Sequence, residues 1–103
     1  MKQYFYETEC QSPQLREQSL LKRLPDFITH AKQECQYYSQ ILNNIDADKV
    51  TNRELLAQLP ITRKSDLMSL QAKNSPLGGL NAKTANLGRV FQSPGPIYDP
   101  ENT

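Results

Sequence analysis

The sequence predicts a mainly α-helical protein: a kinked long helix, two short helices, and an irregular C-terminal tail with one short strand. Residues 14–71 are rich in Leu, Gln, Lys, Arg and Glu and contain no glycine. All four glycines and four of the seven prolines come after residue 75, as in a segment of loops and turns. We therefore divide the chain into a helical part, residues 1–71, and a loop and strand part, residues 72–103.

The long helix is predicted from an apolar seam whose members are spaced alternately three and four residues apart, as on one face of a helix. The spacing does not slip at Pro25, so we expect a kink there rather than a turn. Asn43 and Asn44 are the expected end of this helix. The seam consists of Leu21, Leu24, Ile28, Ala31, Cys35, Tyr38 and Leu42.

Two short helices are predicted from their start signals. Thr51 and Glu54 have the spacing of a capping box, with Thr51 as the N-cap, and Pro60 ends the helix that they open. Thr62 is the expected N-cap of the next helix, and Asp66 adds negative charge near its positive end. The expected buried face of that last helix is Leu67, Met68 and Leu70.

A short strand at 89–92 leads into Ser93-Pro94-Gly95-Pro96. A turn of this composition after a strand can offer backbone N–H groups to phosphate oxygens, although it is more often a simple turn. Pro94 and Pro96 have no amide hydrogen. Ser93 and Gly95 are therefore the candidate phosphate-binding residues.

Composition excludes several classes of function. Twelve basic and eleven acidic side chains give a net charge of +1, so we expect no nucleic-acid partner. We expect no membrane partner either, because no apolar run is long enough to span a bilayer. We also expect no signal peptide and reduced cysteine thiols, which predicts a cytoplasmic location. His30, the only histidine, has no recognisable catalytic neighbours, and Cys10 and Cys35 lack metal-ligand spacing. We predict no catalytic residues and no metal site within this chain.

Several motifs occur in an order that resembles the start of the phenylacetate–CoA ligase family. That family belongs to the adenylate-forming, AMP-binding superfamily of acyl-CoA synthetases. The resemblance covers residues 14 to 101, and its most specific part is L-P-I-T-R-K-S-D-L at 59–67, which matches the family pattern L-P-[VIF]-T-x-K-x-D-L. The other matching segments are His30-Ala31, Tyr37-Tyr38, Gly78-Gly79-Leu80 and the run from Arg89 to Gly95.

The resemblance implies an ATP-dependent ligase that forms an acyl-adenylate and then a CoA thioester. ATP with Mg²⁺, CoA and a small carboxylic acid are implied for the full-length enzyme, but none is expected to bind this segment by itself. Residues 1–71 would be the helical entry of the large α/β N-terminal domain, and 72–103 would reach its phosphate loop. The usual loop reads S-S-G-T-T-G-K-P and this chain reads S-P-G-P-I-Y, as in a divergent branch, so only Ser93 and Gly95 correspond.

On this interpretation the chain is an N-terminal fragment of a ligase. It lacks most of the active site, it is inactive alone, and its partner is the remainder of the ligase polypeptide. The alternative is a stand-alone helical interaction module that forms a homodimer through the Leu21–Leu42 seam.

Overall fold

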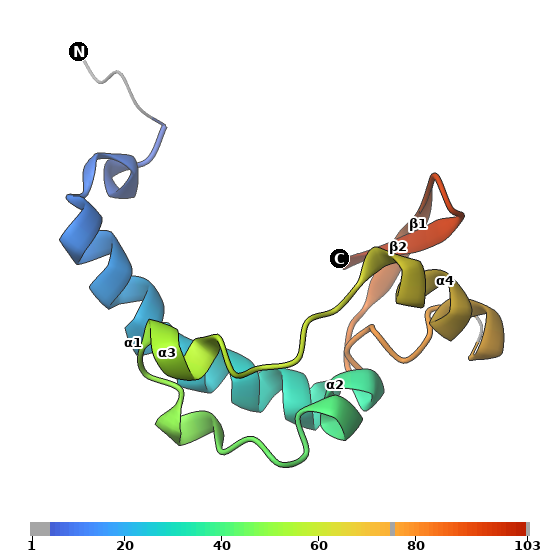
Figure 1. The fold of residues 1–103 in the computed structure, drawn as a ribbon. Helices are drawn as coiled ribbons and strands as arrows, with labels where there is room; N and C mark the ends of the chain where they lie inside the picture. Colours follow the sequence, from blue (N-terminus) through green and yellow to red (C-terminus); the bar gives the residue numbers. More distant parts are fainter. Residues whose placement is uncertain (1–4, 75, 103) are drawn as a thin grey trace.

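The computed structural model describes residues 5–74 and 76–102. These residues are mainly helical and carry one small antiparallel sheet, which confirms the predicted coarse class (Figure 1). Two of the elements, η1 and η2, are short 3-10 helices. In chain order the elements are η1 (Glu7–Cys10), α1 (Pro13–Glu34), α2 (Gln36–Ile41), η2 (Ala47–Lys49), α3 (Arg53–Leu56), α4 (Lys64–Lys73), β1 (Leu87–Ser93) and β2 (Ile97–Asn102).

Helix α1 is continuous through Pro25, and the long helix is instead interrupted at Cys35, whose backbone is extended. The segment that follows α4 explains this interruption. The Tyr37 N–H donates to the Gly79 carbonyl at 3.0 Å, and the Lys83 N–H donates to the Glu34 carbonyl at 2.8 Å. An antiparallel bridge joins Cys35 to the same segment. Backbone groups beside the interruption therefore find partners in a distant part of the chain.

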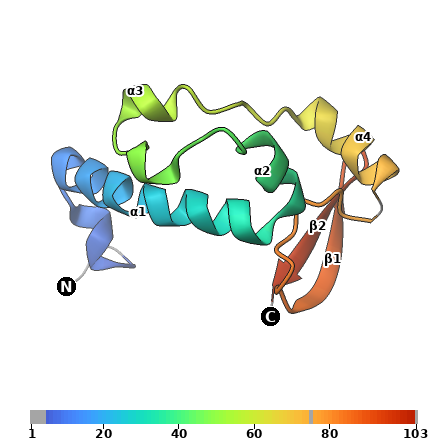
Figure 2. The same cartoon turned by 90° about the horizontal axis from the view of Figure 1, so that it is seen from below.

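The apolar seam is the buried face of the long helix, as predicted, and it packs within the chain. Ile28 and Leu42 form the core with Ala47 and Val50, which lie on and beside η2. The loop that carries η2 and α3 runs back along α1 (Figures 1 and 2). The partly buried residues around this core are Leu24, Tyr38, Ile41, Ile45, Leu55 and Leu59.

The predicted caps of both short helices are wrong by about one residue. Helix α3 is capped by Asn52, whose side-chain oxygen accepts from the Leu55 N–H at 2.8 Å, so the capping box at Thr51 does not form. Helix α4 begins at Lys64 without a side-chain cap. The Thr62 hydroxyl instead pairs with the hydroxyl of Tyr38 at 3.3 Å, because the extended segment before α4 crosses α2 there.

Replacing Asn52 with alanine is expected to lower the free energy of unfolding by about 1 kcal/mol, since it removes an acceptor for an otherwise unpaired helix amide. Thr51→Ala, one residue earlier, should change it by less than about 0.5 kcal/mol. Chemical denaturation followed by far-UV circular dichroism measures both. A larger loss of unfolding free energy from Thr51→Ala than from Asn52→Ala would show that Thr51 caps the helix and that the capping box forms.

The buried face of α4 differs from the prediction. Leu67 and Leu70 are half-buried as expected, but Met68 is 41% exposed. Gln71 is the most buried residue of this helix, at 5% exposure. A polar side chain can be buried at this position because both ends of its amide group are hydrogen-bonded.

The C-terminal segment is a β-hairpin, so the predicted irregular tail with a single strand is wrong. Strands β1 and β2 pair antiparallel, with Ser93 opposite Ile97 and Val90 opposite Pro100, and a bulge lies between Leu87 and Val90. The prolines in and around β2 suggested a loop in the sequence. Proline is compatible with a strand where its nitrogen faces away from the neighbouring strand.

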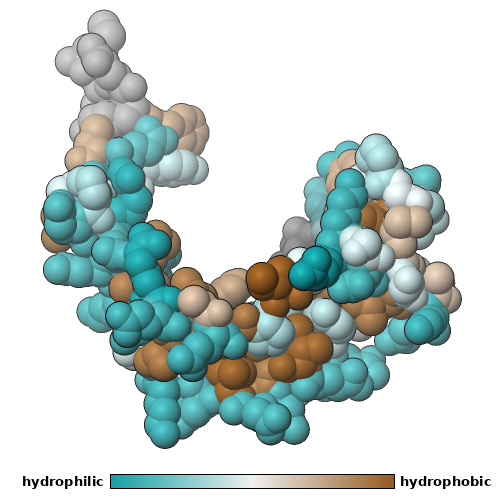
Figure 3. All heavy atoms as spheres, in the orientation of Figure 1, coloured by the Kyte–Doolittle hydropathy of each residue, from teal (hydrophilic) through white to brown (hydrophobic). Residues whose placement is uncertain are grey.

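The described residues form an open arch rather than a compact body (Figures 1 and 3). The radius of gyration is 16.4 Å, whereas a compact domain of this length has about 13 Å. The accessible surface is 8105 Å², against about 5,900 Å² for a compact protein of this mass. The chain therefore leaves about 2,200 Å² more surface in water than a globular protein of its size would.

Candidate functional site

The two candidate phosphate-binding residues, Ser93 and Gly95, lie together in the turn of the hairpin. The Ser93 hydroxyl donates to the Ile97 carbonyl at 3.2 Å across the turn. Gly95 has a φ of +154°, and a Cβ there would lie 3.1 Å from Ile97 Cγ1 and 3.5 Å from Met68 Cγ. The backbone conformation therefore favours glycine at this position, and a Cβ would be tightly placed against Ile97. The turn is tight and packs toward α4.

The turn offers few donors to a phosphate group. The Ser93 hydroxyl hydrogen is used within the hairpin, and Pro94 and Pro96 have no amide hydrogen, so the Gly95 amide is the remaining backbone donor between the strands. These residues alone do not fit the cradle that a triphosphate needs, in which several amides and a lysine converge. Any ATP site at this position depends on groups that other segments supply.

The basic residue nearest to this turn along the chain is already paired. Arg89 donates to both carboxylate oxygens of Glu101, at 2.7 and 3.2 Å, and its guanidinium lies 5.3 Å from the centre of the Phe91 ring. The hydrogen bond from Arg89 lowers the pKa of Glu101, and the same bond raises the pKa of Arg89. The positive charge of Arg89 is thus balanced within the hairpin.

We expect the Glu101 carboxyl to titrate below the ordinary range of glutamate. Because the pKa is lower in the folded chain than in the unfolded chain, where it is about 4.3, the ion pair stabilises the fold at pH values above about 4.3. This contribution is lost as the pH falls through the pKa of Glu101 in the folded chain. An NMR titration of the side-chain carboxyl measures it. Arg89→Gln should return the pKa of Glu101 toward its ordinary value, and an unchanged pKa in that variant would contradict the assignment.

Gln71 fixes the hairpin to α4. Its Nε2 donates to the Tyr98 carbonyl at 2.9 Å, and the Tyr98 N–H donates to its Oε1 at 2.9 Å. The side-chain amide therefore pairs with β2 as a neighbouring strand would. Sequence reasoning missed this residue, although Gln71 lies four positions after Leu67 and so on the same helix face.

An apolar groove of about 320 Å³ runs between α1 and α3. Phe27 on its wall is 68% exposed and Leu20 is 55% exposed. An ion pair between Glu17 and Arg53 joins the two helices beside the groove. Hydrophobic atoms at the surface are also visible along the base of the arch (Figure 3). The residues that line the groove are Leu20, Leu21, Arg23, Leu24, Phe27 and Leu56.

The other residues considered from the sequence form no reactive group. His30 is exposed on α1. Burial, and to a smaller extent the charge of Glu34, raise the pKa of the Cys35 thiol, which disfavours the reactive thiolate. Tyr37 and Tyr38 pack edge to face with their ring centres 5.1 Å apart, so the pair serves packing.

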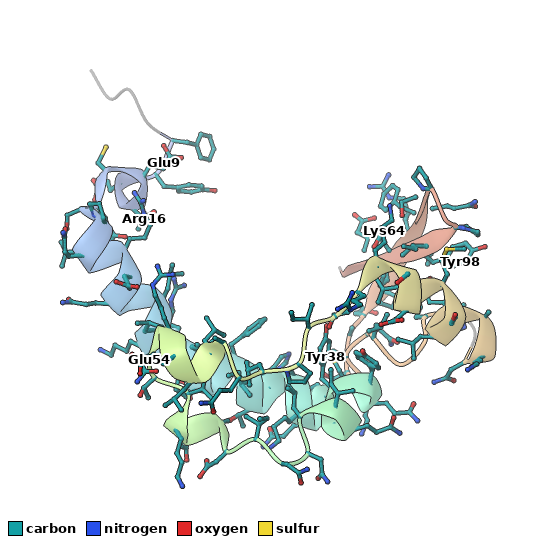
Figure 4. The ribbon with its side chains drawn as sticks, in the orientation of Figure 1. Glu9, Arg16, Tyr38, Glu54, Lys64 and Tyr98 are labelled. Atoms are coloured by element: carbon teal, nitrogen blue, oxygen red, sulfur yellow. The ribbon has the colours of Figure 1, made fainter. Side chains whose placement is uncertain are left out.

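Polar residues labelled in Figure 4 lie in both arms of the arch. Glu9 and Arg16 lie in its N-terminal arm, and Lys64 and Tyr98 lie in the other arm (Figure 4).

Within 5–74 and 76–102, no three His, Cys, Asp or Glu side chains are grouped to hold a metal ion. Among the helices of the same residues, none is both long and apolar enough to cross a membrane. Comparisons of the chain with protein-family models, with curated proteins and with solved structures found no match.

Proposed function

We propose that this chain is the N-terminal segment of an ATP-dependent acyl- or aryl-CoA ligase that resembles phenylacetate–CoA ligases. The observation that carries the proposal is the ordered series of motifs, above all L-P-I-T-R-K-S-D-L at 59–67. The complete enzyme would join a small carboxylic acid to CoA through an acyl-adenylate. The segment itself would supply helical packing and the hairpin turn that holds Ser93 and Gly95.

The contacts among the motif residues support a shared structural role. Tyr38, from the Tyr37-Tyr38 pair, bonds through its hydroxyl to Thr62 of the 59–67 motif. Tyr37 donates its N–H to Gly79 of the glycine pair. Gly79 has a φ of +74°, and a Cβ there would lie 3.3 Å from the Gln36 side chain. Motifs that lie far apart in sequence therefore meet at the start of α2, and glycine is needed for the close approach.

The open shape also supports a segment that lies on a larger body. The surplus of about 2,200 Å² of accessible surface is in the range that obligate interfaces bury. Part of it is apolar, in the groove between α1 and α3 and on β1, where Val90 and Phe91 are about half exposed. Exposed apolar patches are typical of a region that another part of a protein covers.

The alternative, a helical module that dimerises through the Leu21–Leu42 seam, has less support. Ile28 and Leu42, near the middle and at the end of that seam, are covered by residues of the same chain. A dimer along the whole seam would have to displace η2 and its neighbours from this core.

An adenylation assay tests the proposed function. We expect the pure 103-residue chain to form no AMP from ATP with a panel of aryl and acyl carboxylic acids. Joined to the ligase polypeptide that completes it, the segment should support AMP and CoA-thioester formation that depends on the carboxylate. Carboxylate-dependent AMP formation by the chain alone would contradict the assignment of the missing site to other segments.

A further inference from the structure

The long helix is broken at a single residue whose neighbours in sequence favour a helix. Cys35 has an extended backbone, with φ −110° and ψ 118°, and α2 begins directly after it. No glycine or proline lies between Pro25 and Pro60, so the local sequence contains no helix breaker. The apolar seam also keeps its spacing from Ala31 through Cys35 to Leu42. A helix that continued through Cys35 would therefore present the same face to the core.

Backbone groups beside the break have partners in a distant segment in place of helical ones. In a continuous helix, the amides just after Cys35 would donate to the carbonyls of the last turn of α1. Here the Tyr37 N–H donates instead to the Gly79 carbonyl at 3.0 Å. The Glu34 carbonyl accepts from the Lys83 N–H at 2.8 Å. Because these groups are hydrogen-bonded in either arrangement, the broken and the continuous helix differ little in the bonds that they satisfy here.

Residues 79–83, which we call the latch, supply these partners. Ala82 of the latch forms the antiparallel bridge with Cys35. Gly79 has a φ of +74°, and a Cβ there would lie 3.3 Å from the Gln36 side chain, so glycine permits the close approach. In Figures 1 and 2, α2 turns away from the line of α1 at this point. The break therefore follows from the docking of the latch and not from the residues of the helix itself.

We infer that the latch and the break form a two-state joint. With the latch docked, α1 and α2 are separate helices, and with the latch undocked they join into one helix over 13–41. A helix as short as α2 is marginal by itself, and continuing from α1 avoids the cost of a separate helix start. The latch lies between α4 and β1 in the chain. The joint therefore couples the course of the long helix to the position of the hairpin.

This inference does not depend on the proposed function, because it uses only the backbone contacts at the break and the helix propensity of the sequence around it.

Gly79→Val tests the joint from the side of the latch. A β-branched residue is strongly disfavoured at a positive φ, and its Cβ would crowd Gln36. The ratio of docked to undocked chains should therefore fall about thirtyfold. We expect the Cα chemical shifts of residues 34–38, measured by NMR, to move from the pattern of a broken helix to that of a continuous one. The matched control is Gly88→Val on β1, where φ is not positive and valine suits a strand, and it should leave these shifts unchanged.

Cys35→Ala tests the same joint from the side of the helix. Alanine has the higher helix propensity, which should favour the joined helix about threefold. The Lys83 amide is bonded to Glu34 in the docked form. It should therefore exchange with solvent about threefold faster in this variant, since exchange follows the undocked population. Gln33→Ala is the control, because residue 33 is exposed and helical in both states, and it should leave the exchange of the Lys83 amide unchanged.

Three results would overturn the inference. The first is a set of coil-like shifts over α2 in Gly79→Val while the amides of α1 stay protected, which would show that undocking melts α2. The second is a Cys35 that keeps an extended shift in that variant. The third is an unchanged exchange rate of the Lys83 amide in Cys35→Ala. If Gly79→Val unfolds the whole chain, Cys35→Ala decides the question, because it leaves the glycine of the latch in place.

Discussion

Replacing Ile28 with alanine is expected to destabilise the helical part of the chain by about 2–5 kcal/mol. Ile28 is 3% exposed and lies at the centre of the core that joins α1 to α2, η2 and the residues around them. Its removal would leave a cavity in a cluster that has three other buried members among the described residues, so little packing remains to compensate. Because a small domain has little stability to lose, we expect the loss of much of the helical circular dichroism signal at 25 °C.

Phe27→Ala is the control for that experiment. Phe27 precedes Ile28 on the same helix and loses more side-chain atoms, yet it is 68% exposed and outside the core. We expect a change of less than about 1 kcal/mol. Equal effects of the two substitutions, measured by chemical denaturation, would show that the buried face of α1 has been assigned to the wrong residues.

Gln71→Leu is expected to loosen the hairpin from α4. The substitution keeps a side chain of similar size but leaves the N–H and carbonyl of Tyr98 without their partners. The loss of these bonds should cost about 2 kcal/mol. Hydrogen exchange at the Tyr98 amide should accelerate about thirtyfold, since each 1.4 kcal/mol is a factor of ten.

The matched control is Gln33→Leu, the same change at an exposed position of α1. It should leave the exchange of the Tyr98 amide unchanged. If Gln71→Leu also leaves that exchange rate unchanged, the Gln71 amide does not hold the hairpin in place.

The parts of the fold that could be predicted are those that local sequence determines. The seam from Leu21 to Leu42 identified the buried face of the long helix, because side chains three and four residues apart share one face whatever they pack against. Asp66 lies in the first turn of α4 as expected. The N-caps were less accurate, since Thr51 and Asn52 are both good capping residues and only the path of the chain decides between them.

The features that were missed depend on contacts between distant segments. The interruption at Cys35 follows from the bridge to the segment after α4, and no residue near Cys35 is a helix breaker. Strand β2 was missed because Pro100 suggests a loop unless the neighbouring strand and the facing direction are known. The burial of Gln71 likewise depends on Tyr98, which lies 27 residues later.

The turn that carries the two candidate residues was predicted from the sequence. The turn at Ser93 and Gly95 forms where the sequence suggested, and the two residues lie together in it. The sequence could not show that the Ser93 hydroxyl bonds back to Ile97, because that bond depends on the return strand. Their role in binding phosphate stays a prediction.

The coding sequence that follows the Thr103 codon tests the central proposal most directly. Sequencing of the genomic DNA should find ligase-like coding sequence that continues in frame, in a neighbouring frame or in an adjacent gene. It should encode adenine-binding segments, an acyl pocket and a C-terminal domain with its lysine. If nothing ligase-like lies there, the chain is not the entry segment of an adenylating enzyme, and its open arch must serve a different partner.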